Sequence, residues 1–296
     1  MPEVVGPLSV EPVVEEPEGD TEEFLERRLG VGFWLAIAWV VAVTALALLA
    51  PLLPIDGVNQ SVGGRLDPPS LEHWFGTDAN GRDVFARTIW GARVSLSVGF
   101  IAILLGFVVG GTLGMLAGYF KGWVDKIVSF VFLSLLSFPA LVLALLIVKS
   151  LDRSLSVVAL TIGILAIAPV GRLARAFTLV YAEREFVQAA RVIGARNGRI
   201  LVRELLPNVA IPMAALSLLG VAVAIVAEGG LAFLGLSVES GATWGKMILL
   251  GADASTLRKA PHVSMFPILV LFVTVLALNY AGDRIRAYFD VRETAF

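Results

Sequence analysis

The fold class is decided by residues 92–120, which read ARVSLSVGFIAILLGFVVGGTLGMLAGYF. Arg93 is the only charged residue in this stretch, and an apolar helix of about 20 residues is long enough to cross a bilayer core about 30 Å thick. Five more blocks have a similar length and composition: 31–54, 124–149, 155–179, 209–236 and 263–282. The sequence therefore predicts an all-α integral membrane protein with six transmembrane helices.

The composition excludes a water-soluble globule. Of 296 residues, 57% are hydrophobic and 16% are charged, whereas soluble domains are about 45–50% apolar and about 25% charged. The chain has no cysteine, so disulfides, thiolate metal sites and cysteine nucleophiles are excluded. Its 23 cationic and 25 anionic residues are spread over the segments between spans and predict no nucleic-acid partner.

A stripe of small residues follows the second predicted span. One small residue recurs every four positions, at Ala102, Gly106, Gly110, Gly114, Gly118 and Gly122. In a bilayer, such a stripe lets two helix backbones approach closely. We expect tight packing within the protein, with a subunit interface or a pore lining as the alternative. Three other spans contain a proline and are expected to be kinked there, at Pro139, Pro169 and Pro267.

The charged residues predict which side of the membrane each segment occupies. Residues 1–26 hold nine acidic side chains and no cation, a composition typical of a disordered tail. Arg27 and Arg28 precede the first span and place the N-terminus in the cytoplasm. This span is expected to remain uncleaved. Six spans return the C-terminus to the same side. Two substantial loops, 55–91 and 237–262, then lie outside.

The first outer loop contains a predicted amphipathic segment, residues 80–92. Its apolar side would face lipid headgroups and consists of Val84, Phe85, Thr88, Ile89 and Trp90. Its arginines would face water, namely Arg82, Arg87 and Arg93. Asp78, Arg82 and Asp83 are expected to form a capped turn, with contact to a protein outside the membrane as the alternative.

Between the fourth and fifth spans lies a polar but patterned segment, residues 181–208, YAEREFVQAARVIGARNGRILVRELLPN. It predicts two short helices joined by a hinge. The first has an apolar face of Phe186, Ala189, Ala190 and Ile193 and is expected to end at Gly194. The second has an apolar side of Ile200, Leu201 and Leu205 and is expected to stop at Pro207. Such a hairpin is suited to sit in a partner's groove and transmit movement; an interfacial hairpin on anionic lipid is the alternative.

Several blocks of the sequence resemble permeases of bacterial ABC importers. The string QAARVIG, residues 188–194, with Pro207 thirteen residues after its glycine, resembles the EAA loop of these permeases. Other blocks resemble the C-type subunit of peptide/nickel permeases and occur in the same order: HWFGTDANGRDVFARTIWGARVSLSVG at 73–99, GMLAGYFKGWVD at 114–125, EGGLAFLGLSV at 228–238, Trp244-Gly245, and NYAGDRIRAYFD at 279–290.

The resemblance implies a type I ABC importer permease fold with a cytoplasmic EAA coupling hairpin at 181–208. The resemblance covers roughly residues 28–292 and leaves out the acidic tail. Together with the composition, it predicts a disordered acidic cytoplasmic tail (1–26), a first transmembrane helix with its outer loop (27–91) and a permease transmembrane domain (92–290). It implies ATP-driven uptake of dipeptides, oligopeptides or a related small solute across the cell membrane. The implied partners are a second homologous permease subunit, two cytoplasmic ATP-binding subunits, an extracytoplasmic substrate-binding protein and membrane lipid.

The resemblance also implies which residues couple this chain to the ATPase. They are Glu185, Phe186, Gln188, Ala189, Ala190, Arg191, Gly194, Ala195, Leu206 and Pro207. The chain departs from the usual pattern at Gln188, where glutamate is usual, and at Glu204, where an apolar residue is usual. Residues 129–136 and the pair Pro261 and His262 also depart from it. These last departures leave the substrate open.

The sequence predicts no catalytic, cofactor or metal site in this chain. The nearest string to the phosphate-binding loop G-x-x-x-x-G-K-[ST] runs from Gly241 to Lys246 and is one residue short. The two histidines, His73 and His262, lie outside any H-E-x-x-H helix, and G-x-S-x-G does not occur. ATP and magnesium are therefore expected on the partner ATPase subunits.

Glu228 is the one acidic residue well inside an apolar run. A carboxylate there requires a partner, a water-filled cavity or protonation. It is expected either to face the translocation pathway or to hold, by a buried hydrogen bond, a helix break at Gly229 and Gly230. The rival to an importer subunit is a self-sufficient secondary carrier or channel, but an ion-coupled carrier usually needs several charges within the membrane.

Overall fold

The computed structural model describes residues 29–294, so the predicted acidic tail lies outside the described residues. Within them the fold is helical, with one isolated β-bridge between Thr77 and Asp83. Five helices or continuous helix runs are long and apolar enough to cross a membrane. They comprise α2 (Gly30–Leu49) with the short η1 (Ala50–Leu52); α3 (Val84–Leu105), η2 (Gly106–Gly111) and α4 (Thr112–Phe120); α7 (Leu155–Tyr181); the run ending in α10 (Leu206–Phe233); and α13 (His262–Thr294).

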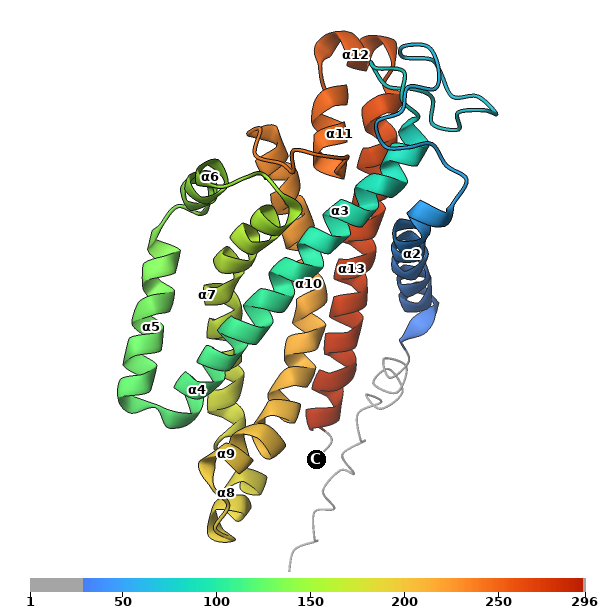
Figure 1. The fold of residues 1–296 in the computed structure, drawn as a ribbon. Helices are drawn as coiled ribbons and strands as arrows, with labels where there is room; N and C mark the ends of the chain where they lie inside the picture. Colours follow the sequence, from blue (N-terminus) through green and yellow to red (C-terminus); the bar gives the residue numbers. More distant parts are fainter. Residues whose placement is uncertain (1–28, 295–296) are drawn as a thin grey trace, which may run out of the picture.

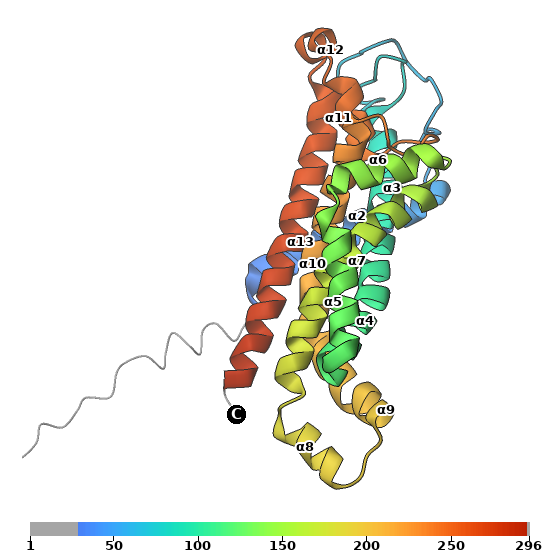
Figure 2. The same cartoon turned by 90° about the vertical axis from the view of Figure 1, so that its left-hand side faces the viewer.

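The third predicted span, residues 124–149, is a bent pair of helices. α5 (Gly122–Ser137) and α6 (Ala140–Ser150) meet at 84°. Pro139 stands at the break, which confirms the kink predicted there, because proline has no amide hydrogen to continue a helix. The described residues therefore contain six spans if this pair counts as one, and Figure 2 shows α6 lying across one end of the bundle.

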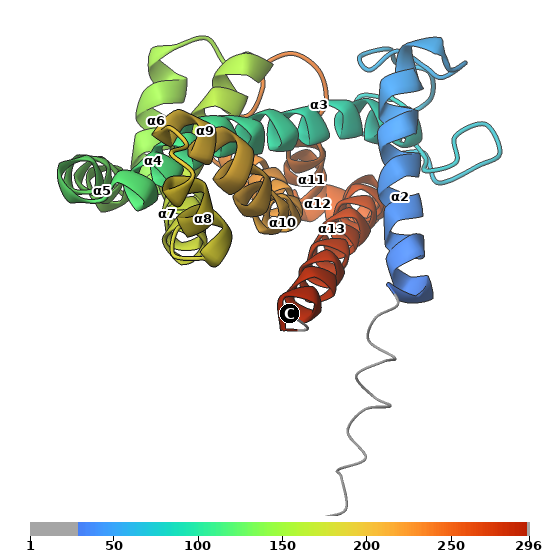
Figure 3. The ribbon, with the colours of Figure 1, turned by 90° about the horizontal axis from the view of Figure 1, so that it is seen from below.

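The bundle has two distinct ends (Figure 1). At one end, the hairpin end, lie α8 (Glu185–Val192) and α9 (Asn197–Arg199), and α13 finishes there as well. At the other, the loop end, lie α6, α11 (Trp244–Gly251), α12 (Ala254–Lys259) and the loop of residues 53–83. Seen along the bundle, α2 and α5 lie on opposite sides, with α7, α10 and α13 between them (Figure 3). The segment that contains α8 and α9 connects α7 to α10, two helices that lie between α2 and α5.

The stripe of small residues packs within the chain, as predicted. A side chain at Gly110 or Gly114 would overlap backbone of α7, at the carbonyl oxygens of Ile167 and Gly171 respectively. η2, a π-helical turn, lies within this stripe. Gly122 departs from the pattern, because it has a φ of +54° and no atom within 4 Å of an added Cβ. It belongs to the turn into α5 rather than to the packing stripe.

The predicted exposure of residues 80–92 is wrong for most of the segment, although Arg93, which is expected to face water, is exposed. α3 begins at Val84, which is completely buried, and Arg87 is only 3% exposed. The cause is that the loop of residues 53–83 and the residues around α11 fold over the start of α3, and Val84 packs with Met247 and Val263. A segment that is amphipathic in sequence is here enclosed by long-range contacts.

Two predicted helix interruptions are also wrong. Pro207 does not stop a helix but stands in the first turn of α10, which continues without a break from the helical residues 197–205. The helix is also unbroken at Gly229 and Gly230 and continues to Phe233. Gly229 instead permits a close helix crossing, because a Cβ added to Gly245 of α11 would come within 2.5 Å of its Cα atom.

The turn between α4 and α5 contains a strained residue. Lys121 has φ 54° and ψ −157°, a conformation that is essentially restricted to glycine and costs about 1–3 kcal/mol in other residues. We expect Lys121→Gly to raise stability by about 1 kcal/mol, since the exposed ion pair between Lys121 and Glu183, which the substitution removes, contributes little. The midpoint of thermal unfolding in detergent measures this. Lys121→Ala, which removes the ion pair but keeps the strain, should not be stabilised.

Candidate functional site

The hairpin between α7 and α10 consists of α8, a glycine turn, α9 and a π-helical turn, η3 (Ile200–Leu205). Gly194 follows α8 with a φ of +83°, a conformation that favours glycine. The amides of Gly194 and Ala195 donate to the carbonyls of Arg191 and Ala190, which satisfies the end of the helix. The prediction that Gly194 ends the first helix is confirmed.

Apolar side chains anchor the hairpin to α4. Val187 of α8 is completely buried and clusters with Met115 and Tyr119 of α4. The predicted apolar side of the second helix belongs to the same cluster and is buried, namely Ile200, Leu201 and Leu205. Both arms of the hairpin are therefore packed against α4 by buried apolar side chains.

The far side of α8 exposes apolar side chains at the extreme hairpin end. Val192 is 88% exposed, Ile193 is 86% exposed and Phe186 is 37% exposed, and Ala189 is exposed with them. We call these four residues the hairpin tip. The predicted apolar face of the first helix therefore points outward, apart from Ala190, which is half-buried. Exposed apolar groups gathered in this way are typical of a surface that binds a partner.

The other predicted coupling residues are distributed along the hairpin and into α10. Polar residues and the capping glycine are exposed along α8 and its turn: Glu185, Gln188, Arg191 and Gly194. Ala195 is half-buried against the anchor, and Leu206 and Pro207 are exposed in the first turn of α10. Most of the predicted coupling residues are therefore exposed, whereas Ala190 and Ala195 are half-buried.

Two residues that position the hairpin have no counterpart among the sequence predictions. Val187 lies beside the predicted face, and its spacing of three from the half-buried Ala190 is the pattern that could have revealed it. Tyr119 donates a hydrogen bond from its hydroxyl to Oδ1 of Asn197 at 2.9 Å. These residues are 78 positions apart, and no local pattern predicts that contact.

Glu228 is buried inside the chain at the loop end of α10. Its side chain is 0% exposed; Ser237 donates to Oε1 at 2.8 Å and Ser95 donates to Oε2 at 3.4 Å. The Ser95 hydroxyl also accepts the backbone amide of Trp244 at 3.2 Å. The carboxyl group therefore joins α3, α10 and the start of α11. Its role in a translocation pathway stays a prediction.

Replacing Glu228 separates these two roles. Glu228→Ala leaves the hydroxyls of Ser95 and Ser237 without a buried acceptor, and we expect it to cost about 1–3 kcal/mol of stability. Glu228→Gln keeps one acceptor oxygen and should cost less. Thermal unfolding in detergent and transport activity are measured for both variants. If Glu228→Gln is as stable as the wild type but inactive, hydrogen bonding alone does not explain this residue.

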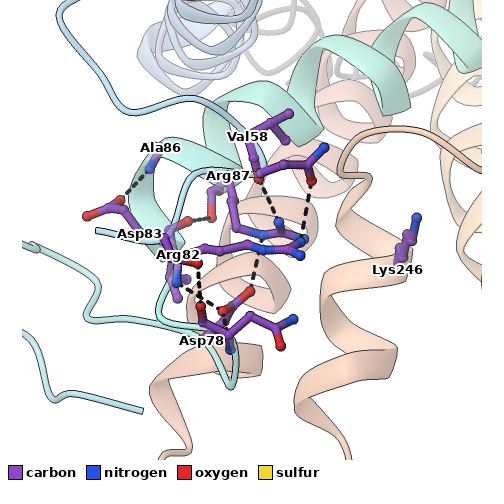
Figure 4. Close-up of polar contacts among 12 residues, drawn as sticks. Val58, Asp78, Arg82, Asp83, Ala86, Arg87 and Lys246 are labelled. Atoms are coloured by element: carbon purple, nitrogen blue, oxygen red, sulfur yellow. Dashed lines mark hydrogen bonds and ion pairs between the residues drawn. The ribbon is translucent and has the colours of Figure 1, made fainter. Parts of the chain in front are cut away.

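The predicted capped turn at the loop end is confirmed (Figure 4). Asp78 accepts the backbone amides of Asn80 at 2.7 Å and Arg82 at 3.1 Å. Asp83 accepts the amide of Ala86 at 2.6 Å and so caps α3. Asp83 satisfies an orphan amide at the start of the helix, and Asp78 satisfies amides of the turn that precedes it, so both carboxylates stabilise this turn.

Arg87 ties this turn to the rest of the outer loop. Its Nη1 donates to the carbonyl oxygen of Val58 at 2.7 Å, and its Nε lies 3.5 Å from Oδ2 of Asp78 (Figure 4). Lys246 of α11 contributes another cation, whose Nζ donates to the carbonyl of Glu239 at 2.9 Å. Burial lowers the pKa of Lys246, and the charges of Arg87 and other nearby arginines lower it further. The turn is therefore held to residue 58 and to the start of α3 by a buried guanidinium that is paired with a carboxylate.

Known proteins are similar to this chain in sequence and in fold. Residues 110–294 match the family described as binding-protein-dependent transport system inner membrane component. The chain is 38% identical over 261 residues to the dipeptide transport system permease protein DppC of Alkalihalophilus pseudofirmus, covering 86% of this chain and 85% of that protein. It is 35% identical over 269 residues to the glutathione transport system permease protein GsiD of Pectobacterium atrosepticum, covering 90% and 88%.

A solved structure has the same fold. A chain of the MetNI methionine ABC transporter in an inward-facing conformation aligns with a TM-score of 0.55 at 20% identity, covering 71% of this chain and 96% of that chain. Similarity at this level of identity concerns the fold alone, whereas the family match spans well over half of this sequence. The chain belongs to the family of binding-protein-dependent transport system inner membrane components, as a multi-pass permease subunit of an ABC importer.

Proposed function

We propose that the chain is the C-type permease subunit of an importer for dipeptides, oligopeptides or a related small solute. The dipeptide and glutathione permease proteins to which it is similar along most of its length support this substrate class. Both names describe short peptides. The second permease and the external binding protein would share in selecting the cargo.

The proposed complex contains a second homologous permease, two cytoplasmic ATP-binding subunits and an extracytoplasmic substrate-binding protein, surrounded by membrane lipid. The hairpin end and both termini face the cytoplasm, because Arg184, Arg191, Arg196, Arg199 and Arg203 all lie in the hairpin segment. The loop end faces outward and receives the binding protein. This chain itself carries no catalytic site or cofactor, and ATP with magnesium binds to the partner subunits.

The observation that carries the proposal is the hairpin tip. Phe186, Val192 and Ile193 expose apolar surface at the end of the molecule, while the base of the hairpin is packed onto α4 by completely buried side chains such as Val187. Because the base of the hairpin is packed onto α4, a displacement of the tip by a partner would be transmitted to the membrane helices. Closure of the ATPase dimer would then displace the hairpin and rock the helices between inward-open and outward-open states.

Uptake by living cells tests the proposal. Cells that lack this chain should lose uptake of a labelled dipeptide and recover it when the wild-type chain is supplied, and unlabelled tripeptides or glutathione should compete if they share the route. Uptake should stop when cellular ATP is depleted while the membrane potential is maintained. Uptake that follows the membrane potential and not ATP would support the secondary carrier instead.

A further inference from the structure

The turn that joins α4 to α5 lies against the hairpin. We call residues 119–122, which include Tyr119 and Lys121, the α4–α5 corner. Its chain direction reverses over Lys121 and Gly122, both of which have positive φ values, +54° each. A non-glycine residue held in that region indicates a constraint from the surroundings, and such residues are frequent at switch regions.

Three separate parts of the hairpin contact this corner. Tyr119, which is 8% exposed, donates to the Asn197 side chain of α9 at 2.9 Å. The guanidinium of Arg191 on α8 lies over the Tyr119 ring, 5.4 Å from its centroid, a cation–π arrangement. Lys121 Nζ lies 2.6 Å from Oε1 of Glu183, in the turn that enters α8. The entry, first arm and second arm of the hairpin all reach the same corner.

The ion pair is electrostatically favourable although it is exposed. The Lys121 ammonium holds the pKa of the Glu183 carboxyl below its usual range. An exposed pair of this kind contributes little to global stability. It adds to the contacts of Tyr119 that hold the corner against the hairpin.

Beyond the corner, α5 leads to the loop end of the molecule. It starts at Gly122 and continues into α6 after the 84° bend. Asp125, one turn into α5, is paired with Arg175 of α7 through two contacts of 2.5 and 2.7 Å. Asp125 therefore fixes the first turn of α5 to the helix that enters the hairpin, while Lys121, the residue before α5, is paired with Glu183 at the entry of the hairpin.

We propose that the α4–α5 corner connects the hairpin mechanically to α5 and α6, beside its chain links to α7 and α10 and its apolar anchor on α4, and that Tyr119 and Lys121 are positioning residues that pass hairpin displacement to α5 and α6. The inference rests on the proposed function, because it assumes that an ATPase moves the hairpin. Its consequence is that the bent α5–α6 pair moves with each ATP cycle.

Two distances measured by paired spin labels in the full complex test this, since the chain has no cysteine of its own. Arg196→Cys with Ala287→Cys reports the hairpin relative to α13, and Ile127→Cys with Ala287→Cys reports α5 relative to α13. All three positions are exposed. The complex, with cysteine-free partner subunits, is compared without nucleotide and after trapping with ATP and vanadate. We expect both distances to change in the otherwise unmodified chain.

The corner variant combines Tyr119→Phe with Glu183→Gln, which removes the hydrogen bond and the ion pair while keeping side-chain size. We expect the hairpin distance still to change and the fraction of complexes with a shifted α5 distance to fall roughly threefold. The matched control combines Tyr280→Phe with Glu239→Gln, which removes the hydrogen bond from Arg284 and the ion pair with Arg153 elsewhere. It should leave both changes intact.

The outcomes separate this inference from the function on which it rests. If the hairpin distance does not respond to nucleotide, the proposed ATPase coupling fails, and the inference fails with it. If the hairpin responds but the α5 distance does not, or if it shifts equally in the corner variant, the inference alone is overturned. A purely structural role for Tyr119 would lower the amount of folded protein without uncoupling the two distances.

Discussion

Ala189→Glu is expected to abolish ATP-driven transport while the chain still folds. Ala189 is exposed on α8 beside Phe186, so a carboxylate there meets water in the isolated chain and should change its stability by less than about 0.5 kcal/mol. In the complex the same carboxylate would be buried against the ATPase without a designed partner. That penalty is about 3 kcal/mol or more, which weakens ATPase association roughly a hundredfold.

Co-purification of the ATPase subunits from detergent, with uptake measured in cells, checks this result. The matched control is Ala252→Glu, the same substitution at an exposed position of the loop end, which should leave ATPase association unchanged. A fully active complex that carries Ala189→Glu would show that the hairpin tip does not lie in the ATPase interface.

Gly114→Leu should have the largest effect on folding. Any side chain at this position overlaps the carbonyl oxygen of Gly171 and approaches the amide of Arg175, so α4 and α7 must separate. Backbone atoms cannot move aside as a flexible side chain can, and we expect a loss of at least about 3 kcal/mol. The yield of monodisperse protein and its thermal unfolding midpoint measure the effect.

Gly111→Leu is the control for that substitution. Gly111 stands three residues earlier in the same helix run, but a Cβ added there meets no atom within 4 Å. It should fold nearly as well as the wild type. Equal stability of the two leucine variants would contradict the close packing of α4 on α7.

The sequence predicted features that depend on local pattern. The six apolar blocks, the cap at Gly194 and the small stripe through Gly114 follow from length, glycine chemistry and spacing, and each is visible within a short window. The hairpin was predictable for the same reason, since its two apolar sides recur with helical spacing over residues 186–205.

The features that could not be predicted depend on long-range contacts. The start of α3 reads as amphipathic, but residues from three other segments enclose Val84 and Arg87. In the sequence Gly229 suggests a helix break, but in the structure it allows α10 and α11 to cross closely at Gly245. Tyr119 shows no sign in sequence that it meets Asn197. In each case the partner lies too far along the chain for a local pattern to reveal it.

The side of the membrane on which the hairpin lies tests the central claim most directly, because an ATPase can reach it only from the cytoplasm. Single cysteines are introduced into the cysteine-free chain by Arg196→Cys in the hairpin and Leu71→Cys in the outer loop, where Leu71 is 96% exposed. Intact cells are then treated with a membrane-impermeant thiol reagent. We predict that position 71 is labelled and that position 196 is labelled only after the membrane is permeabilised. Labelling of position 196 in intact cells would contradict the account of this chain as an ATP-driven importer subunit.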